Sequence, residues 1–375
     1  MWRHVCLGAL LAASQPACSK ILGIEDFALT PDAPPDAPGP DAQLCWGSGL
    51  APVCITTPAA GVKVLDAALD TDTLGTCTDL IAQPAGPELC VIAANQINIS
   101  NTVTATGARP LMLLATDTIN IGGTLDVSSK RTAAKAGAGA NFMGCGAGAT
   151  PPTTATAGGG GAGGTFGVRG TNGGDGFVNL ATVNNNGVSG AILGLTFVRG
   201  GCKGQDGGDI SATTQGGPGG SSGGAVYLFA ATSITVDGNI YASGAGGASG
   251  ALHTGGAGGG SGGLIGLESP TITVNGIIAA NGGNGSAGSS TTAGGAGPDG
   301  ATMALNTQPA AATNGANGGG TGGRGVTGMT PTAGTTGGAG TVSGGAGGGG
   351  GGGNGIVWVK GTLTGTMIAP APTLN

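Results

Sequence analysis

A pattern of alternating apolar and polar residues recurs along this chain and constrains its fold more than any other feature. Within each copy every second residue is apolar, which is the periodicity of a β-strand with one buried face. A Gly or Asn then turns the chain, and a second short strand follows. The copies lie at residues 89–107, 111–127, 226–244, 265–282 and 357–365. Four of them carry an apolar residue at one equivalent inward position, namely Ile97, Ile119, Ile234 and Ile272. We expect these four side chains to form one interior column.

The length of the repeat predicts how the copies assemble. Ile97 and Ile119 are 22 residues apart, a length that suits three short strands and three turns. A unit this small cannot bury its apolar face alone, so the units must stack. The sequence therefore predicts an all-β chain in which residues 89–375 coil as a right-handed parallel β-helix, or solenoid, whose hand follows from the crossover rule. The alternative is a β-sandwich of hairpins, which predicts closely spaced Asn-Gly turns between paired strands.

Glycine is concentrated between the repeats. The chain has 87 Gly in 375 residues, and 76 of these lie in residues 131–375. They form long blocks at about 130–222, 245–262 and 283–354, which are expected to leave the solenoid from one side as insertions. No strict three-residue period is present, which argues against collagen. Because ordering glycine is entropically costly, the blocks either stay mobile or gain dense backbone hydrogen bonding from close chain approach.

The N-terminus has the features of an export signal. Residues 1–17 contain a basic start, the apolar run Val5–Ala13 and the small residue Ala17. Together with Cys18 this stretch resembles a bacterial lipoprotein signal, which implies that Cys18 carries a lipid that anchors the chain to the outer membrane or cell surface. The alternative is an ordinary secretory signal with an incidental Cys. Residues 18–43 then form an Asp/Pro-rich tether of extended polyproline geometry.

Six cysteines remain beyond the signal and Cys18, and an even number in an exported protein suggests three disulfides. Sequence proximity favours three pairs among the possible ones: Cys45 with Cys54, Cys77 with Cys90, and Cys145 with Cys202. Residues 44–88 are accordingly predicted to form a disulfide-stapled N-terminal cap.

The signal, the tether and the Gly-rich repeats resemble the glycine-rich surface lipoproteins of predatory and social Gram-negative bacteria. The Gly-Gly-Ala blocks are also similar in composition to the repeat region of mycobacterial PE-PGRS proteins, although this chain has no PE domain. The resemblance implies a location and a general architecture, and it implies no chemistry.

Charge and motifs argue against several functions. Residues 131–375 carry 7 basic and 6 acidic groups, so they lack the clustered Lys and Arg that nucleic acid requires. Matches to Gly-x-Gly-x-x-Gly open no helical pattern, and no cofactor is predicted. Asp175, Asp206 and Asp209 resemble fragments of Gly/Asp-rich calcium repeats, but that motif needs tandem copies. They are only weak candidate metal ligands, and no metal site is predicted.

One outward face has the chemistry of a binding surface. Met112, Tyr227 and Trp358 fall in one outward column of the repeat alignment. A neighbouring column is uncharged and polar, with Asn98, Asn120, Thr235, Thr273 and Thr364. Such a surface suits contact with glycans or other cell-surface components, unless a Gly-rich loop covers the aromatic residues.

Many polysaccharide-cleaving enzymes are β-helices, and acid/base chemistry on a glycosidic bond needs two neighbouring carboxylates. No column of the repeat alignment stacks two carboxylates, so no catalytic residue is predicted. The sequence therefore predicts a non-enzymatic structural or adhesive lipoprotein of the cell envelope. The alternatives are a carbohydrate-active enzyme, similar to a polysaccharide lyase or glycosidase, and a glycan- or surface-binding module.

Overall fold

The computed structural model describes residues 44–55, 60–133, 136–146, 148–301, 309–313, 317–329 and 333–375. All regular secondary structure in these residues is β, as predicted, and none of them belongs to a helix that could cross a membrane. The predicted signal peptide, Cys18 and the tether lie outside the described residues.

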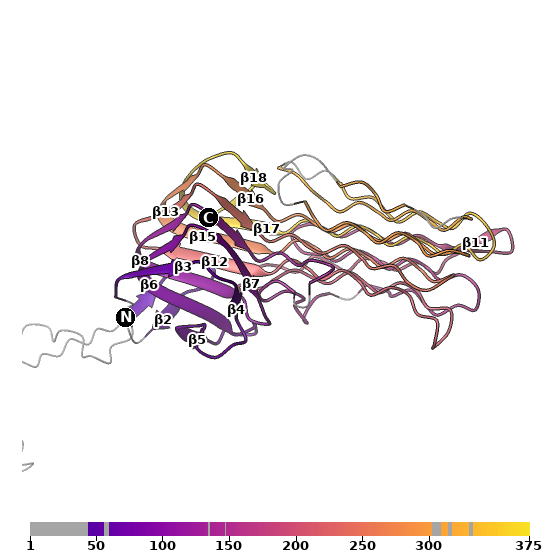
Figure 1. The fold of residues 1–375 in the computed structure, drawn as a ribbon, viewed down its shortest axis with the longest axis horizontal. Helices are drawn as coiled ribbons and strands as arrows, with labels where there is room; N and C mark the ends of the chain where they lie inside the picture. The colour runs from indigo at the N-terminus through magenta and orange to yellow at the C-terminus, as the bar shows by residue number, and fades with distance from the viewer. Residues whose placement is uncertain are drawn as a thin grey trace, which may run out of the picture. The chain divides into compact units, whose positions relative to one another are not determined.

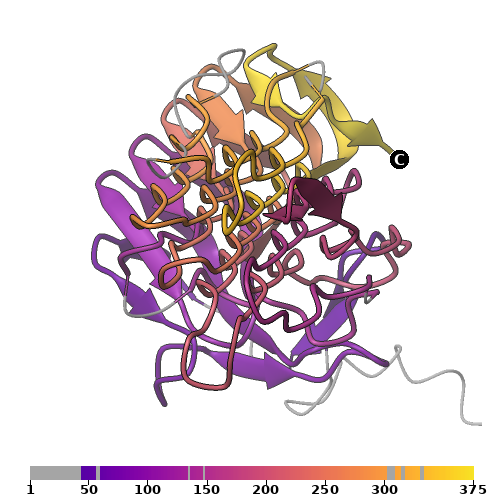
Figure 2. The same ribbon diagram turned by 90° about the vertical axis from the view of Figure 1, so that its right-hand side faces the viewer.

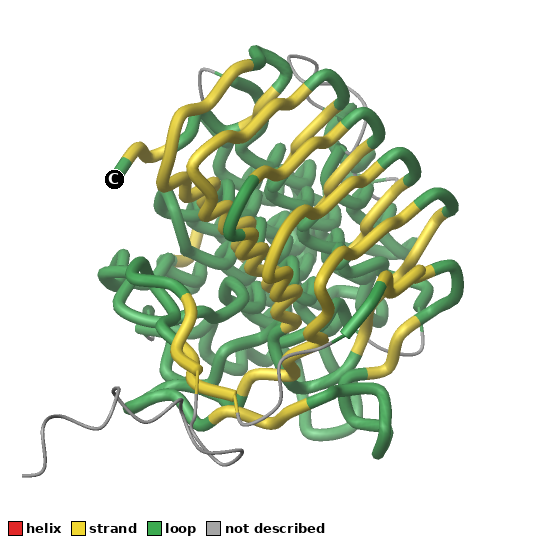
Figure 3. The backbone as a smooth tube through the Cα atoms, turned by 90° about the vertical axis from the view of Figure 1, so that its left-hand side faces the viewer, coloured by secondary structure: helices red, strands yellow, loops and turns green. Residues whose placement is uncertain are grey.

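The repeats build two sheets, which Figure 3 shows as rungs of strands placed side by side. In the described residues the larger sheet has nine strands and the smaller has six. The larger sheet contains β3 (Val62–Leu65), β5 (Asp79–Ile81), β6 (Leu89–Ile99), β8 (Leu111–Ile121), β12 (Ala225–Ala230), β13 (Ser233–Val236), β15 (Leu264–Val274), β17 (Ile356–Thr364) and β19 (Thr373–Leu374). The smaller sheet contains β4 (Leu69–Asp70), β7 (Thr102–Thr106), β9 (Thr124–Asp126), β14 (Asn239–Tyr241), β16 (Ile277–Ala279) and β18 (Ile368–Ala369).

Pairing between repeats is parallel and in register. Ile97 pairs with Ile119, Ile119 with Ile234, and Ile234 with Ile272, so the predicted interior column is confirmed. All four side chains are fully buried. Parallel neighbours need a crossover connection, and a β-sandwich of hairpins requires antiparallel ones. The pairing of the repeats is therefore not that of the sandwich alternative.

The smaller sheet supplies the facing half of the core. Its inward column contains Val103, Leu125, Ile240, Ile278 and Ile368, which are paired in sequence from one strand to the next. These side chains and the isoleucine column belong to one buried cluster. Each fully buried aliphatic side chain of this kind contributes about 1.5–3 kcal/mol.

The N-terminal region contributes to both sheets. β3 and β4 extend the larger and the smaller sheet by one parallel strand each, through pairing with β6 and β7. The hairpin formed by β1 (Leu44–Trp46) and β2 (Val53–Ile55) packs instead on the outer face of the larger sheet. All three predicted disulfides are present: Cys45–Cys54, Cys77–Cys90 and Cys145–Cys202.

The glycine blocks run side by side away from the sheets, as expected for insertions that leave from one side (Figure 1). One small hairpin, β10 (Gly176–Val178) with β11 (Ala181–Val183), lies at the far end of the first block. Viewed along the length of the glycine blocks, the segments form an array in which each lies next to several others (Figure 2). We call this array the glycine bundle and define it as the described parts of residues 157–224, 242–263, 280–300 and 309–355.

Hydrogen bonds in the glycine bundle recur at every third residue. The N–H groups of Gly158, Gly161 and Gly164 donate to the carbonyls of His253, Gly256 and Gly259. The carbonyls of the same three glycines accept from Gly347, Gly350 and Gly353. A three-residue period without bonds inside the segment is the geometry of a polyproline II helix. The blocks are expected from the sequence either to stay mobile or to gain dense backbone hydrogen bonding. The structure shows the second, with hydrogen bonds between closely packed segments.

Close approach explains why these positions are glycine. A Cβ added to Gly158, Gly161 or Gly164 would overlap the backbone of a neighbouring segment. Residues 158–164 are buried, and a buried N–H or carbonyl needs a hydrogen-bond partner. The absence of side chains lets the segments approach closely enough to supply those partners from one another.

Candidate functional site

The predicted outward column of Met112, Tyr227 and Trp358 exists but is not a surface. The three residues pair through consecutive strands β8, β12, β15 and β17, with Gly266 between Tyr227 and Trp358. Met112 and Tyr227 are completely buried and Trp358 is 8 % exposed. The β1–β2 hairpin, Phe166 and Val198 pack over them in a second apolar cluster. The prediction that this column contacts a ligand is therefore corrected, because a segment far away in the sequence covers it.

Burial of Tyr227 requires partners for its hydroxyl. Tyr227 Oη donates to Glu268 Oε2 at 2.5 Å and accepts from the backbone N–H of Leu50 at 3.3 Å. Gly266 makes room for the ring, since a Cβ there would overlap it. Burial is the main cause that raises the pKa of Tyr227 well above its ordinary value, and the hydrogen bond to Glu268 adds to it.

Glu268 is the centre of a small polar network at the edge of the β1–β2 hairpin where it packs on the larger sheet. It faces outward on β15, and its residue is only 5 % exposed. Its Oε1 accepts the backbone N–H of Ser48 at 2.8 Å and the Ser48 hydroxyl at 3.2 Å. Lys360 on β17 lies beside it, with Nζ 3.9 Å from Oε1 and 2.8 Å from Ser48 Oγ. A buried carboxylate is tolerated only when paired and hydrogen-bonded, and Glu268 is both.

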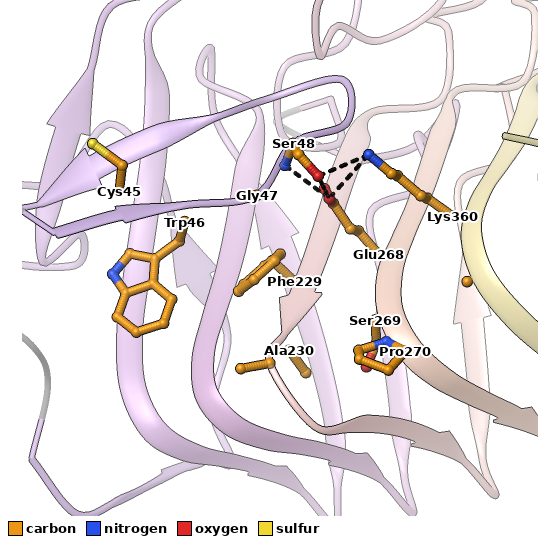
Figure 4. Close-up of a pocket in the computed structure, with 12 residues that line it drawn as sticks. Cys45, Trp46, Gly47, Ser48, Phe229, Ala230, Glu268, Ser269, Pro270 and Lys360 are labelled. Carbon is orange, nitrogen blue, oxygen red and sulfur yellow. Dashed lines mark hydrogen bonds and ion pairs between the residues drawn. The ribbon is translucent and has the colours of Figure 1, made fainter.

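A pocket of about 440 Å³ opens next to this network (Figure 4). Trp46 and Phe229 form an aromatic side, with ring centroids 6.3 Å apart and planes tilted by 55°. Ala231 and Pro270 add apolar wall, and Glu268 with Lys360 forms the polar side. Among the described residues that line it, Glu268 and Lys360 are the charged ones, so the pocket carries opposite charges that cancel.

Two polar groups near the pocket have no partner among the described residues. These are the Nε1 of Trp46, which points away from the pocket in Figure 4, and the buried hydroxyl of Ser269. Both atoms are buried, and neither makes a hydrogen bond to the Glu268 network. The polar chemistry available to a ligand is therefore that of Glu268, Lys360 and Ser48.

The three candidate aspartates bind backbone groups in the glycine bundle. Asp206 Oδ1 accepts the N–H of Gly219 and Asp209 Oδ1 accepts the N–H of Gly216, each at 2.7 Å. Asp175 accepts the N–H groups of Asn185 and Asn186, both at 3.2 Å.

Asp206 and Asp209 line one polar groove of about 380 Å³. Within the part of the chain that the structure describes, no group of three His, Cys, Asp or Glu residues could hold a metal ion. Asp206 and Asp209 instead accept hydrogen bonds from backbone N–H groups of the glycine segments.

The predicted polar ladder lies on the outer side of the strands. Asn98, Asn120, Thr235, Thr273 and Thr364 pair in this order. Amide and hydroxyl groups bond between rungs, as from Asn120 to Asn98 at 3.1 Å and between Thr364 and Thr273 at 3.3 Å. These contacts stabilise neighbouring strands, as cross-strand pairs do in other sheets.

Sequence reasoning missed Trp46, Ser48, Glu268 and Lys360 as a group. One signal was present, because the repeat alignment places Glu268 and Lys360 in the same column, and the structure pairs them. Ser48 carried no signal, since its place depends on the packing of the hairpin.

Comparison of the chain with models of known protein families, with curated proteins and with solved structures finds no match. What the protein does must therefore be inferred from its own residues and their geometry.

Proposed function

We propose that this protein is a non-enzymatic structural or adhesive component of the cell envelope. It is exported, anchored by a lipid on Cys18 and held away from the membrane by the tether of residues 18–43. The anchor rests on the sequence of residues 1–18 alone. The role proposed for the rest of the chain rests on the described residues.

The proposed architecture is a right-handed parallel β-solenoid that carries the glycine bundle on one side. In-register parallel pairing of β6, β8, β12, β15 and β17 supports the stacking of coils. The right hand follows from the crossover preference of parallel strands. Coils that stack on one apolar core form a stiff scaffold rather than a hinged enzyme.

The observation that carries the proposal is the period-three hydrogen bonding of the glycine bundle. A segment such as residues 158–164 bonds to neighbours on several sides, near residues 171–174, 205–208, 253–259 and 347–353. An array fixed in this way has little freedom to close on a substrate, and it has few side chains that could do chemistry. It suits a rigid element that presents or spaces a surface.

Amide hydrogen exchange of the purified protein tests the rigid bundle. We expect slow exchange for the hydrogen-bonded N–H groups of residues 158–164, comparable to those of β8, because each can exchange only after its hydrogen bond breaks and the neighbouring segments separate. Exchange as fast as in an unstructured glycine peptide would contradict the proposal.

Labelling with radioactive palmitate in a Gram-negative host tests the anchor. We expect label in the natural chain and none in Cys18→Ser, with the natural chain in the outer-membrane fraction. Incorporation that is independent of Cys18 would rule out this anchor.

Polysaccharide hydrolysis tests the absence of catalysis. We expect no release of reducing or unsaturated ends from a panel of neutral and acidic polysaccharides. Cleavage that Asp206→Ala or Asp209→Ala abolishes would establish the alternative of a carbohydrate-active enzyme.

A further inference from the structure

We propose that the pocket formed by Trp46, Phe229, Glu268 and Lys360 binds one neutral sugar ring of a glycan. This inference deepens the proposed function by naming the ligand class of its adhesive role, and it rests on that role. The site differs from the outward column predicted from the sequence, because that column is buried beneath the β1–β2 hairpin.

Shape gives the first argument. The rings of Trp46 and Phe229 are tilted by 55° at 6.3 Å, and with Pro270 they border an open hollow. A pyranose ring has an apolar face of C–H groups that packs against aromatic rings. The cavity of about 440 Å³ lies within the roughly 300–1,000 Å³ range of small-molecule sites.

Charge gives the second argument. Glu268 and Lys360 neutralise each other, and Glu268 is largely buried. A cationic ligand would have to displace Lys360, and an anionic one would face the carboxylate. A neutral ligand leaves the pair intact, so the site favours an uncharged partner.

Hydrogen-bonding capacity gives the third argument. Glu268 already accepts from the Ser48 N–H, the Ser48 hydroxyl and the Tyr227 hydroxyl. An ionised carboxylate has about four acceptor positions, so about one remains. Lys360 has three N–H donors, and Ser48 Oγ takes one of them at 2.8 Å. One acceptor and spare donors beside an aromatic wall match the hydroxyl groups at the edge of a sugar ring.

The three features come from separate parts of the chain that meet only in the fold. Trp46 and Ser48 are in the hairpin region, Phe229 is on β12, Glu268 on β15 and Lys360 on β17. Sugar binding at this place therefore requires the β1–β2 hairpin to be docked on the sheet. It also predicts that the ligand protects the hairpin from opening.

Titration of the full chain with neutral oligosaccharides tests the inference. A glycan array selects the sugar, and calorimetry measures the affinity of the free oligosaccharide. We expect saturable binding of at least one neutral glycan and no preference for sialylated or uronic-acid forms. Trp46→Ala should weaken binding by about tenfold or more, which corresponds to about 1.4 kcal/mol.

Lys360→Met is a second variant, because Lys360 is partly exposed and its loss removes donors without opening the core. We expect a weakening of several-fold, measured well below a melting temperature that is itself lowered because the buried carboxylate of Glu268 loses its ion-pair partner. The matched controls are Phe177→Ala and Lys203→Met, an aromatic residue and a lysine that lie in the glycine-rich part. Both should bind as the natural chain does.

Several results would overturn the inference. These are flat binding across the array, equal affinity in Trp46→Ala and the natural chain, or equal loss in the control variants. If the bundle amides still exchange slowly in that case, the structural role stands and only the sugar site fails. Fast exchange would instead remove the proposed function itself.

Discussion

Individual glycines decide which segments of this protein can touch. At Gly258 an added Cβ would overlap the carbonyl of Ala162 on a neighbouring segment, whereas at Gly194 it would meet nothing within 4 Å. The same residue type therefore has two different roles. At Gly258 it permits contact between chains, and at exposed Gly194 it only adds freedom to the unfolded chain.

Paired substitutions test this difference. We expect Gly258→Ala to destabilise the protein by about 1–3 kcal/mol, because backbone must shift to admit the methyl group. Gly194→Ala should be neutral or stabilise by up to about 1 kcal/mol, by restricting the unfolded chain. Thermal unfolding of both variants decides the matter, and similar melting temperatures would contradict close packing at Gly258.

The buried hydroxyl of Tyr227 predicts a loss of stability at alkaline pH. An unfolded tyrosine ionises near its ordinary pKa of 10.0, whereas burial and Glu268 raise the pKa of Tyr227 in the fold. The folded state therefore keeps a proton that the unfolded state loses. The free energy of unfolding should be insensitive to this group below about pH 10 and fall above it, by up to about 1.4 kcal/mol per pH unit.

Urea unfolding between about pH 8 and pH 11 measures this effect. Tyr227→Phe should be less stable at pH 8, because it leaves Glu268 short of one donor, but its stability should decline less steeply above pH 10. Some decline should remain, since burial and then Asp126 also raise the pKa of Tyr241. An unchanged slope in Tyr227→Phe would show that this hydroxyl is not buried.

At the scale of the element, each strand has an inward side that determines stability and an outward side whose role depends on its cover. On β13, Ile234 is fully buried between Ile119 and Ile272, and its neighbour Thr235 is partly exposed in the polar ladder. Two adjacent residues on one strand therefore allow a direct comparison of the two faces.

We expect Ile234→Ala to cost about 2–5 kcal/mol, because it leaves a cavity between two packed neighbours. Thr235→Ala should change stability by no more than about 0.5 kcal/mol, as surface substitutions do. Chemical denaturation of the two variants gives both values. A cost at Thr235 as large as that at Ile234 would mean that the ladder is covered in solution.

Alternation made these elements predictable. The inward columns, their register and the assignment of Asn98, Asn120 and Thr235 to one outward ladder all follow from a period of two residues. The cover on the other outward column was not predictable in this way. β1 and β2 are three residues each, too short for a periodic signal, and they pack on strands far along the chain.

At the scale of the whole molecule, the disulfides close loops of very different length. Cys145–Cys202 closes 57 residues inside the first glycine block, whereas Cys45–Cys54 closes 9 residues in one hairpin. A crosslink that closes a longer loop removes more entropy from the unfolded chain.

Replacing both cysteines of a pair by serine tests this ordering. In the chain-entropy account, loss of Cys145–Cys202 should cost about 4 kcal/mol and loss of Cys45–Cys54 about 2.5 kcal/mol. Denaturant unfolding of the two double variants compares them at equal pH and salt. Loss of the Cys45–Cys54 disulfide should additionally weaken sugar binding, because Trp46 and Ser48 lie next to Cys45 in the sequence. A larger loss of stability on removing Cys45–Cys54 than on removing Cys145–Cys202 would contradict the chain-entropy account.

The amino-acid sequence by itself determined the alternating strands and their shared interior column, because these repeat at a fixed spacing. It also indicated the three disulfide pairs, because each joins cysteines that are consecutive along the chain. Only the tertiary structure decided the state of the glycine blocks and the fate of the Tyr227 and Trp358 column. Both depend on contacts between segments far apart, such as Ser48 with Lys360 across 312 residues. Glycine has no side chain whose pattern could record its neighbours, and a short hairpin has no period that could reveal the face it covers.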